Sequence, residues 1–490
     1  MRSRSFPRPA CLAALAAATA LSATCARNPA TGRLQLSFIS EAREIEMGRQ
    51  YDQEVVAHMG LYPDPALQAY VQQLGSRLAA RSERPQLPWT FRVVDDPVVN
   101  AFALPGGFIY VTRGILAHFQ SEAQLTAVLG HEIGHVTARH SVNQMSKQQL
   151  AQIGLVLGTV IKPSLQRYAG LASAGLGVLF LKHGRDDERE ADDLGLRYMT
   201  RGGFDPREMP GVFTMLGQVS AAAGGGGTPE WLSTHPNPEN RRERIEAAIS
   251  SLDQDFEAAT VDRDGYLRRI DGLVFAENPR DGFFRGAEFL HPDLEFRLSF
   301  PEGWKTVNQR SAVIGISPRE DAVMQLTLSG AATPAAGARA FFSETGLSGG
   351  ASRGTINGLE AVSGAFRANA DGGAGGAGGA LRGYVAFVAY AGSVFRLLAY
   401  ANEARWPSYD AVATSAIRSF DRLTDPTALD VQPYRLSLVS LERDMTLEQF
   451  VRRYPAPVPA AMLALINQLA PGGRFVAGSL AKRIVGRRLP

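Results

Sequence analysis

Apolar positions in the first half of the chain recur with the spacing of an α-helix. Residues 40–250 show this helical pattern almost throughout. Ser121 and Gln124 form a capping-box pattern, which is a typical helix start. An apolar stripe of helical period follows them, at Leu125, Val128, Leu129 and Val136. The pattern predicts a buried helix that begins beside Ser121.

The pattern changes after residue 250. Residues 286–422 alternate strand-like runs with Gly-rich turns, which predicts an α+β domain with an antiparallel sheet. The predicted strands are Leu294–Phe300, Val313–Ile316, Ala322–Leu328, Tyr384–Tyr390 and Ser393–Tyr400, and the predicted helices are Ala338–Glu344 and Tyr409–Ser419. The Gly/Ala run Asp371–Ala380 is interpreted as a mobile hairpin loop.

Residues 430–490 form a third predicted unit, with the order strand, helix, helix, strand. The expected elements are Tyr434–Val439, Leu447–Tyr454, Pro459–Leu469 and Ala481–Val485. The segment Asp444–Leu447 resembles part of a LysM-like glycan-binding repeat, although Arg443 stands where that repeat has glycine. This resemblance implies contact with peptidoglycan. The basic end, Lys482 to Arg488, is either a site for anionic polymer or lipid, or a solvated tail.

Composition is that of an ordinary globular protein. Of 490 residues, 45% are hydrophobic and 20% charged. The formal net charge of +3 is too small to favour binding to nucleic acid.

The amino terminus has the features of an export signal. Arg2, Arg4 and Arg8 precede a 14-residue apolar run from Ala10 to Ala23, too short to span a bilayer. Leu21–Cys25 resembles a lipoprotein signal, with Cys25 as the lipidated residue, although Thr24 departs from the usual glycine or alanine. Ordinary cleavage near Ala18–Ala20 is the alternative.

Cysteine content agrees with export but excludes a disulfide framework. Cys11 and Cys25 are the only cysteines, so the mature chain has no internal disulfide and no cysteine ligand for a metal. The apolar run Tyr168–Leu181 is also too short for a membrane span, and we expect a core helix or an interfacial helix there. A lipid anchor is the only membrane attachment that the sequence predicts.

Residues His131–His135 read H-E-x-x-H within the predicted helix. Positions i and i+4 lie on one helical face, so both imidazoles can reach one ion. This pattern is typical of a zinc hydrolase, in which two histidines bind the metal and Glu132 is the general base. Two histidines with ordinary hydrogen bonds would be the alternative, but Glu132 would then be a buried charge without a role.

Catalytic zinc usually has three protein ligands, so a third one is required. The metzincin pattern fails, because Ala138 and Ser141 replace its glycine and third histidine. His140 is one residue out of register and is expected beside the ligands or at the surface. A glutamate from a later helix is the other route, and Glu190 shares a helical face with Leu194 and Tyr198. The neighbouring acids, Asp186, Asp187 and Glu188, fit a solvated helix start.

Four sequence blocks together resemble zinc metallopeptidase family 48, which contains HtpX, the CAAX prenyl endopeptidase and the periplasmic protease BepA. The blocks are Asn100–Gly107, His131–His135, Glu188–Asp192, and Thr234–Pro238 with Arg241. The resemblance covers roughly residues 26–250 and is greatest to the soluble periplasmic branch. It implies that His131, His135 and Glu190 bind one Zn²⁺ per chain, that Glu132 is the base, and that Asp192 holds a ligand histidine.

The same resemblance suggests roles outside the zinc ligands. His235 is expected either to gate the metal or to stabilise the oxyanion, with Arg241 assisting; otherwise His235 only packs a turn. Asn100, Ala101 and Phe102 lead towards the strand-like run Phe108–Val111. In gluzincin-type proteases an edge strand beside the zinc pairs with extended substrate. A hairpin that only builds the core is the alternative.

The predicted fold class is α+β and multidomain: a mostly helical gluzincin-type peptidase domain with a small sheet, then an antiparallel α+β domain, then a small LysM-like βααβ unit. The predicted boundaries are 1–25 for the signal peptide, 26–252 for the peptidase domain, 253–285 for a linker, 286–425 for the accessory domain, and 430–490 for the terminal unit.

The predicted function is a zinc-dependent endopeptidase of the bacterial periplasm, and lipid on Cys25 would anchor it to the outer membrane. The resemblance implies misfolded or stalled envelope proteins as substrates and the outer-membrane assembly machinery as a partner. Two alternatives remain: a periplasmic chaperone or scaffold with little turnover, and a cell-wall enzyme that cuts peptidoglycan cross-links.

Overall fold

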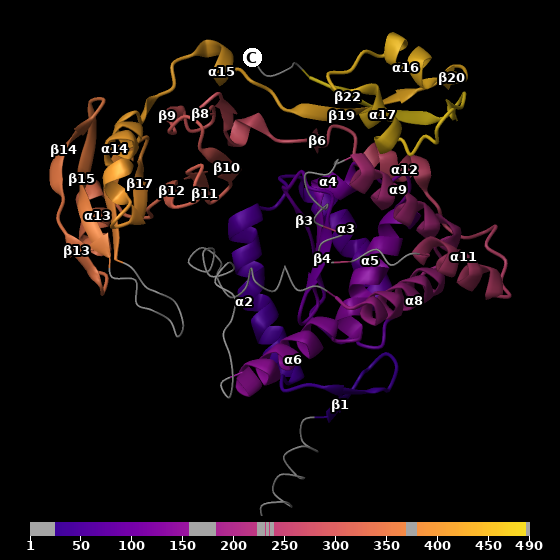
Figure 1. Ribbon diagram of the computed structural model, residues 1–490. Helices are drawn as coiled ribbons and strands as arrows, with labels where there is room; N and C mark the ends of the chain where they lie inside the picture. The colour runs from indigo at the N-terminus through magenta and orange to yellow at the C-terminus, as the bar shows by residue number, and fades with distance from the viewer. Residues whose placement is uncertain are drawn as a thin grey trace, which may run out of the picture.

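The computed structural model describes residues 25–155, 183–222, 231, 235, 240–368 and 380–486. A helical region in the first half of the chain lies beside a sheet-rich domain, and the C-terminal unit lies against the helical region (Figure 1). The α+β, multidomain class is confirmed by this mixture of helices and separate sheets.

The helical region surrounds a three-stranded sheet of order β3-β5-β4, in which β3 and β5 are parallel and β4 is antiparallel to β5. A short hairpin of β1 and β2 precedes it. The elements are β1 (Cys25–Arg27), β2 (Leu34–Leu36), α2 (Glu41–Met59), α3 (Pro65–Ala79), β3 (Thr90–Val94), β4 (Ala101–Leu104), β5 (Phe108–Thr112), α4 (Arg113–Leu116), α5 (Glu122–Thr137), α6 (His140–Leu155), α8 (Arg185–Arg201), η2 (Pro206–Glu208), α9 (Met209–Ala222), α11 (Arg241–Ser251) and α12 (Arg263–Arg269).

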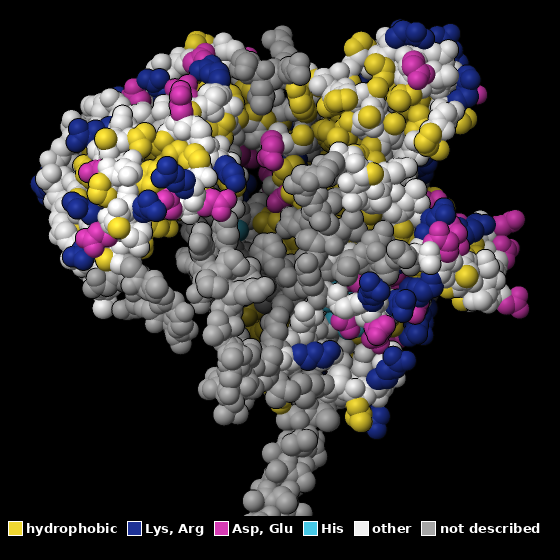
Figure 2. Space-filling view, in the orientation of Figure 1, with side chains coloured by type: hydrophobic (Ala, Val, Ile, Leu, Met, Phe, Trp, Pro, Cys, Tyr) yellow, Lys and Arg dark blue, Asp and Glu magenta, His cyan; other side chains and the backbone are white. Residues whose placement is uncertain are grey.

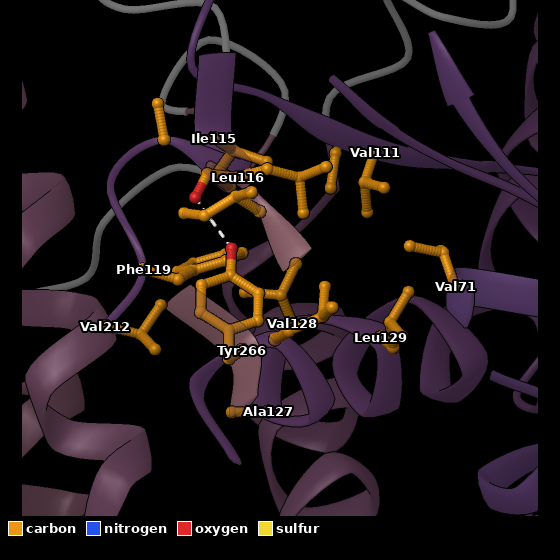
Figure 3. Packing of buried hydrophobic residues seen from close by; sticks show 14 of the residues in the cluster. Val71, Val111, Ile115, Leu116, Phe119, Ala127, Val128, Leu129, Val212 and Tyr266 are labelled. Carbon is orange, nitrogen blue, oxygen red and sulfur yellow. Dashed lines mark hydrogen bonds between the residues drawn. The ribbon is translucent and has the colours of Figure 1, made fainter. Parts of the chain in front are cut away.

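Helix α5 lies at the centre of this region, and its side chains are buried along its whole length. The predicted start is confirmed: the hydroxyl of Ser121 accepts a hydrogen bond from the backbone N–H of Gln124. Val128 and Leu129, which belong to α5, pack into an apolar cluster with Tyr266 from α12 (Figure 3). Tyr266 donates its hydroxyl hydrogen to the carbonyl of Leu116 at 2.6 Å, which satisfies the one polar group of this side chain.

The interval 253–285, expected as a linker, contains folded elements. It holds α12, β6 (Val274–Phe275), η4 (Pro279–Asp281) and β7 (Phe283–Arg285). Strand β6 pairs with β19 of the C-terminal unit, so this interval joins the two halves of one core.

The accessory domain is built on an eight-stranded antiparallel sheet. Helix α13 packs on one cluster of apolar side chains and α14 on another. The elements of this part of the chain are β8 (Glu288–His291), β9 (Phe296–Ser299), β10 (Lys305–Gln309), β11 (Ala312–Ile316), β12 (Ala322–Leu328), α13 (Pro334–Phe342), β13 (Leu347–Gly349), β14 (Ser352–Ile356), β15 (Leu359–Ala368), β16 (Leu381–Tyr390), β17 (Ser393–Asn402), η5 (Trp406–Ser408), α14 (Asp410–Arg418), β18 (Asp421–Arg422) and α15 (Pro426–Leu429). The five strands and two helices predicted here all occur, with ends shifted by a few residues.

The C-terminal unit has the predicted order of long strands and helices, and β19 pairs with β22. Its elements are β19 (Tyr434–Ser440), β20 (Met445–Thr446), α16 (Leu447–Arg453), α17 (Ala460–Ile466), β21 (Arg474–Phe475) and β22 (Leu480–Val485). Its apolar side chains belong to the same buried cluster as those of α5.

For Lys482, the structure corrects the interpretation of the basic end as a binding site or a solvated tail. This side chain is fully buried, and its ammonium group donates to the carbonyls of Ala117 and Phe119, both at 2.8 Å. Lys482 therefore fastens the C-terminal unit to the segment that leads into α5.

No helix in the described ranges is long and apolar enough to cross a membrane. The run Tyr168–Leu181, the apolar run Ala10–Ala23 and most of the loop Asp371–Ala380 lie outside the described residues.

Candidate metal centre

Helix α5 presents His131, Glu132 and His135 to one buried position. The i, i+4 spacing brings the two imidazoles together, with their Nε2 atoms 3.0 Å apart. All three side chains are 3% exposed or less.

Small residues let α8 approach α5 closely. The backbone of Gly130 contacts that of Gly195, and Gly134 lies against Ala191. A Cβ atom on Gly195 would lie 2.9 Å from the backbone nitrogen of His131, closer than side chains tolerate. This contact places the first turn of α8 directly over the two histidines.

Glu188, from that first turn, is the carboxylate that faces the imidazoles. Its side chain is fully buried, and its oxygens lie 3.5 Å from the Nε2 atoms of His131 and His135. The interpretation of Glu188 as part of a solvated helix start is wrong.

Glu190 does not face the imidazoles, which corrects the predicted third ligand. One helical residue rotates a side chain by about 100°, so Glu190 lies on a different face from Glu188. Its carboxylate contacts Nε2 of His140 at 3.1 Å and the side-chain amide of Asn28 at 3.0 Å. Glu188 takes the position that the sequence analysis assigned to Glu190.

His235 enters the same space from the opposite side. Its Nδ1 lies 2.9 Å from Glu188 and 3.4 Å from Nε2 of His131, and its Nε2 lies 3.7 Å from Glu132. The ring stacks on Trp231 with a centroid separation of 4.3 Å, and its backbone N–H donates to the carbonyl of Trp231. These contacts hold the imidazole inside the site.

Asp192 and Arg241 hold the side chains of His131 and Glu188 in place. Asp192 lies 3.0 Å from Nδ1 of His131, so Nε2 of that ring points towards the site. Arg241 binds both Asp192 and Glu188 through its guanidinium, with contacts of 2.5–3.1 Å. Arg241 therefore neutralises part of the negative charge of Asp192 and Glu188.

The surrounding charges shift the pKa values of these groups in opposite directions. Burial opposes protonation of His131, but Asp192 and Glu188 outweigh it and raise the pKa of His131 to about 9. Burial would raise the pKa of Glu188, but His235 and His131 hold it well below its usual value. Burial raises the pKa of Glu132.

The donor set fits a zinc ion. His131, His135, Glu188 and His235 each offer one ligand atom, and these atoms all lie within 4.8 Å of one another. Imidazole nitrogen and carboxylate oxygen are the ligands of catalytic zinc. Glu132 is also buried, and neither of its oxygens has a hydrogen-bond partner within the described part of the chain. A buried carboxylate in that state is suited to receive a proton from water at the metal.

Sequence reasoning missed two groups here. Glu188 was detectable, because the small residues Ala191 and Gly195 form the packing face of α8 and Glu188 precedes Ala191 by three residues on that face. His183 gave no such signal. Its ring centroid lies 4.0 Å from that of His135, and its Nδ1 is buried with no hydrogen-bond partner among the described residues.

Helix α5, which carries the two histidines, packs against β4, the strand of the predicted substrate segment. Asn100 precedes β4, which contains Ala101 and Phe102, and within the described residues β4 is an edge strand paired only with β5. Cys25 begins β1, the first described element.

Comparison with known proteins identifies the class. Residues 65–249 match the model of peptidase family M48, and this range contains all the residues of the group just described. These residues are a metallopeptidase domain of family M48, and the predicted family is confirmed.

Several curated proteins share this domain. The chain is 34% identical over 224 residues to the Beta-barrel assembly-enhancing protease of Yersinia pestis, covering 44% of this chain and 45% of that protein. Its identity to the protein of the same name from Escherichia coli (strain K12) is 32% over 222 residues, with the same shares. Mitochondrial metalloendopeptidase OMA1 of Arabidopsis thaliana is 38% identical over 173 residues, or 35% of this chain and 33% of that protein. The chain thus spans less than half the length of these relatives.

Solved structures resemble the chain only weakly. Cyanobacterial PsbP from Synechocystis sp. PCC 6803 covers 28% of this chain and 94% of its own, with 12% identity and a TM-score of 0.22.

Proposed function

We propose that the protein is a zinc-dependent endopeptidase. The observation that carries this proposal is the buried group of His131, His135, Glu188 and His235 with Glu132 beside it. A zinc ion held by such residues acts as a Lewis acid and lowers the pKa of water from about 16 to about 7.

Glu132 performs the proton transfers in this mechanism. As general base it takes the proton of the attacking water, and it then passes that proton to the leaving amine. Its raised pKa, caused by burial, brings it nearer to neutral pH and makes it a better base than an exposed glutamate. Asp192 and Arg241 keep the imidazole of His131 oriented during these proton transfers.

Edge strand β4 is proposed to bind the substrate as an added strand. No strand in the described ranges pairs with its second edge, and main-chain groups there would give affinity without strict sequence specificity. The side-chain oxygen of Asn100 is buried and has no hydrogen-bond partner in the described part of the chain. It could accept a hydrogen bond from a substrate N–H once a local movement exposes it.

His235 is proposed to be a gate. It is near the metal ligands and Glu132 at once, in the space where water and a peptide carbonyl would bind. We expect His235→Ala to raise the initial rate of cleavage of an unfolded protein such as casein by several-fold, with zinc retained by the other three ligands. If cleavage and zinc affinity were both unchanged, His235 would have no role at the metal. A loss of cleavage with zinc retained would instead support the role in stabilising the oxyanion.

The names of the relatives support a place in the bacterial envelope. Two of them are called Beta-barrel assembly-enhancing protease, so we propose action on misfolded or stalled outer-membrane proteins in the periplasm, near their assembly machinery. Lipid on Cys25 would anchor the chain to the outer membrane.

Glu132→Gln tests the enzyme against the scaffold alternative. The amide keeps the shape of the side chain but cannot act as a base, so cleavage of casein should fall by about 10²–10⁴-fold with zinc still bound. In cells that lack the gene, this variant should fail to restore the wild-type phenotype. Full complementation by Glu132→Gln would favour a chaperone or scaffold.

The C-terminal unit is proposed to contact peptidoglycan. A groove of about 570 Å³ lies between this unit and α9, lined by residues that include Gln218, Thr446 and Pro459. Figure 2 shows apolar side chains gathered over this unit, at the upper right. Co-sedimentation of the intact protein with purified sacculi tests the contact, since the unit shares its core with the peptidase domain. If the protein stayed in the supernatant at every concentration of sacculi, the contact would be refuted. Release of cross-link fragments would identify a cell-wall hydrolase.

A further inference from the structure

His135 is connected to the surface by a path of hydrogen bonds that passes through His140. Arg139, with φ of 59°, turns the chain between α5 and α6, and His140 is the first residue of α6. This turn folds His140 back, so that its Nδ1 lies 2.9 Å from Nδ1 of His135. Its Nε2 lies 3.1 Å from Glu190. Only 2% of His140 is exposed.

The direction of each hydrogen bond follows from the orientation of His135. Its Nε2 faces His131 in the metal group, so that atom must offer a lone pair and the proton must be on Nδ1. Nδ1–H of His135 then donates to Nδ1 of His140. The remaining nitrogen of His140 carries its proton and donates to the carboxylate of Glu190. This path thus selects the tautomer of His135 that can bind a metal.

The other end of the path is the amino-terminal hairpin, residues 25–36. Asn28 accepts hydrogen bonds from the backbone N–H groups of Ala30 and Thr31 through Oδ1, which forms an Asx turn. That turn directs Nδ2 towards Glu190, and it donates to Oε1 at 3.0 Å. Asn28 is 5% exposed, so little water competes for this bond.

The hairpin is also held against α6. The backbone N–H of Phe38, two residues after β2, donates to the hydroxyl of Ser146 at 3.2 Å. The two elements joined by the path, the hairpin and the turn between α5 and α6, are therefore docked together independently of Asn28.

We infer that Asn28, Glu190 and His140 form a positioning relay, through which the docked amino-terminal hairpin strengthens metal binding by His135. The inference rests on the proposed function, because it requires a metal in the group. Glu190 thereby has a role at the metal without touching it. Undocking the hairpin, whose first residue is Cys25, would weaken metal binding from outside the site.

Zinc affinity of the full chain, measured by competition with a chromogenic chelator, tests the relay. Removal of a residue that orients a ligand usually lowers metal affinity about 10- to 100-fold, and we expect this for His140→Ala. Asn28→Asp is the sharper variant: its carboxylate still accepts from Ala30 and Thr31, but it cannot donate to Glu190 and adds a like charge beside it. We expect a loss of zinc affinity of up to about tenfold for Asn28→Asp.

The double variant distinguishes a relay from two separate effects. If Asn28 acts through His140, Asn28→Asp should lower zinc affinity no further once His140 is alanine, because the path is already broken. Leu34→Ala is the matched control, since Leu34 lies on β2 of the same hairpin and is 68% exposed. It should leave zinc affinity unchanged. Cobalt bound to Asn28→Asp should show an altered visible spectrum, which reports ligand geometry without any measure of activity.

Three results would overturn the relay. The first is an unchanged zinc affinity and cobalt spectrum in Asn28→Asp, and the second is full additivity with His140→Ala. The third is a loss of zinc affinity accompanied by a lower melting temperature of the metal-free protein. The last would make Asn28 a structural residue only. Failure of the wild type to bind zinc at all would refute the proposed function, which is a separate result.

Discussion

Glu132 is a carboxylate buried among other charges. Burial raises its pKa, His235 and His131 oppose that rise, and Glu188 adds to it. The result is a base whose proton affinity is above that of an exposed glutamate. The deprotonated form of Glu132 is the form that the proposed mechanism needs.

The pH dependence of kcat/KM should show this shift. A raised pKa means that Glu132 keeps its proton to a higher pH, so the basic form, and the activity, are lost as pH falls through the raised value. The acid limb should therefore have its midpoint above 4.5, the ordinary value for glutamate.

Zinc content must be measured at each pH of this profile, because protonated histidines release metal. A midpoint at or below 4.5 with zinc still bound would contradict the assignment of Glu132 as a buried base.

At the scale of elements, the close packing of α5 and α8 brings together the proposed metal ligands His131, His135 and Glu188. The capping-box pattern predicted the start of α5 at Ser121, and the H-E-x-x-H motif identified its two histidines. The spacing of apolar residues predicted that this helix is buried. It was not sufficient to select Glu188 over Glu190, because an amphipathic pattern identifies a buried face but not the neighbour against which that face packs. Small residues carry that second kind of information, since they mark where two helices touch.

Gly195→Ala tests the importance of this close contact. The added Cβ would lie 2.9 Å from the backbone nitrogen of His131, so α8 must move away and carry Glu188 with it. We expect a loss of about 1–3 kcal/mol in the free energy of unfolding, and weaker zinc binding. Denaturant unfolding and chelator competition measure the two effects.

Gly217→Ala is the matched control. It lies in α9, where a Cβ would meet no atom within 4 Å, so alanine should be neutral or slightly stabilising. If Gly195→Ala behaved like Gly217→Ala, the close contact between α5 and α8 would not be needed for stability or zinc binding.

At the scale of the whole molecule, the C-terminal unit and the peptidase domain share one core. Local patterns predicted the strands and helices of the terminal unit, because these depend on nearby residues. They did not predict docking, because the contacts of Lys482 with Ala117 and Phe119 join positions more than 360 apart in sequence. A lysine in a basic tail gives no local signal that it is buried.

Lys482→Met should destabilise both parts together. Methionine fills similar space but donates no hydrogen bond, so two buried carbonyls lose their partner, at a cost of about 2 kcal/mol. Unfolding followed by intrinsic fluorescence and by zinc release should give one coincident transition, shifted to lower denaturant.

Lys305→Met serves as the control, because Lys305 lies on the exposed strand β10 and its side chain is 71% exposed. Separate transitions for the two probes in the wild type, or unchanged stability in Lys482→Met, would show that the terminal unit folds independently.

The central claim is that Glu188 completes a zinc centre that hydrolyses peptide bonds. Zinc bound per chain and casein cleaved can be followed on the same samples as zinc is returned to metal-free wild type, Glu188→Gln and Glu190→Gln. We predict that wild-type cleavage rises with bound zinc and stops rising at one ion per chain. Glu190→Gln should reach the same zinc content and the same rate of cleavage, but only at a higher concentration of free zinc. Glu188→Gln should bind zinc poorly and cleave nothing. Cleavage by the metal-free wild type, or full zinc binding and cleavage by Glu188→Gln, would contradict the claim.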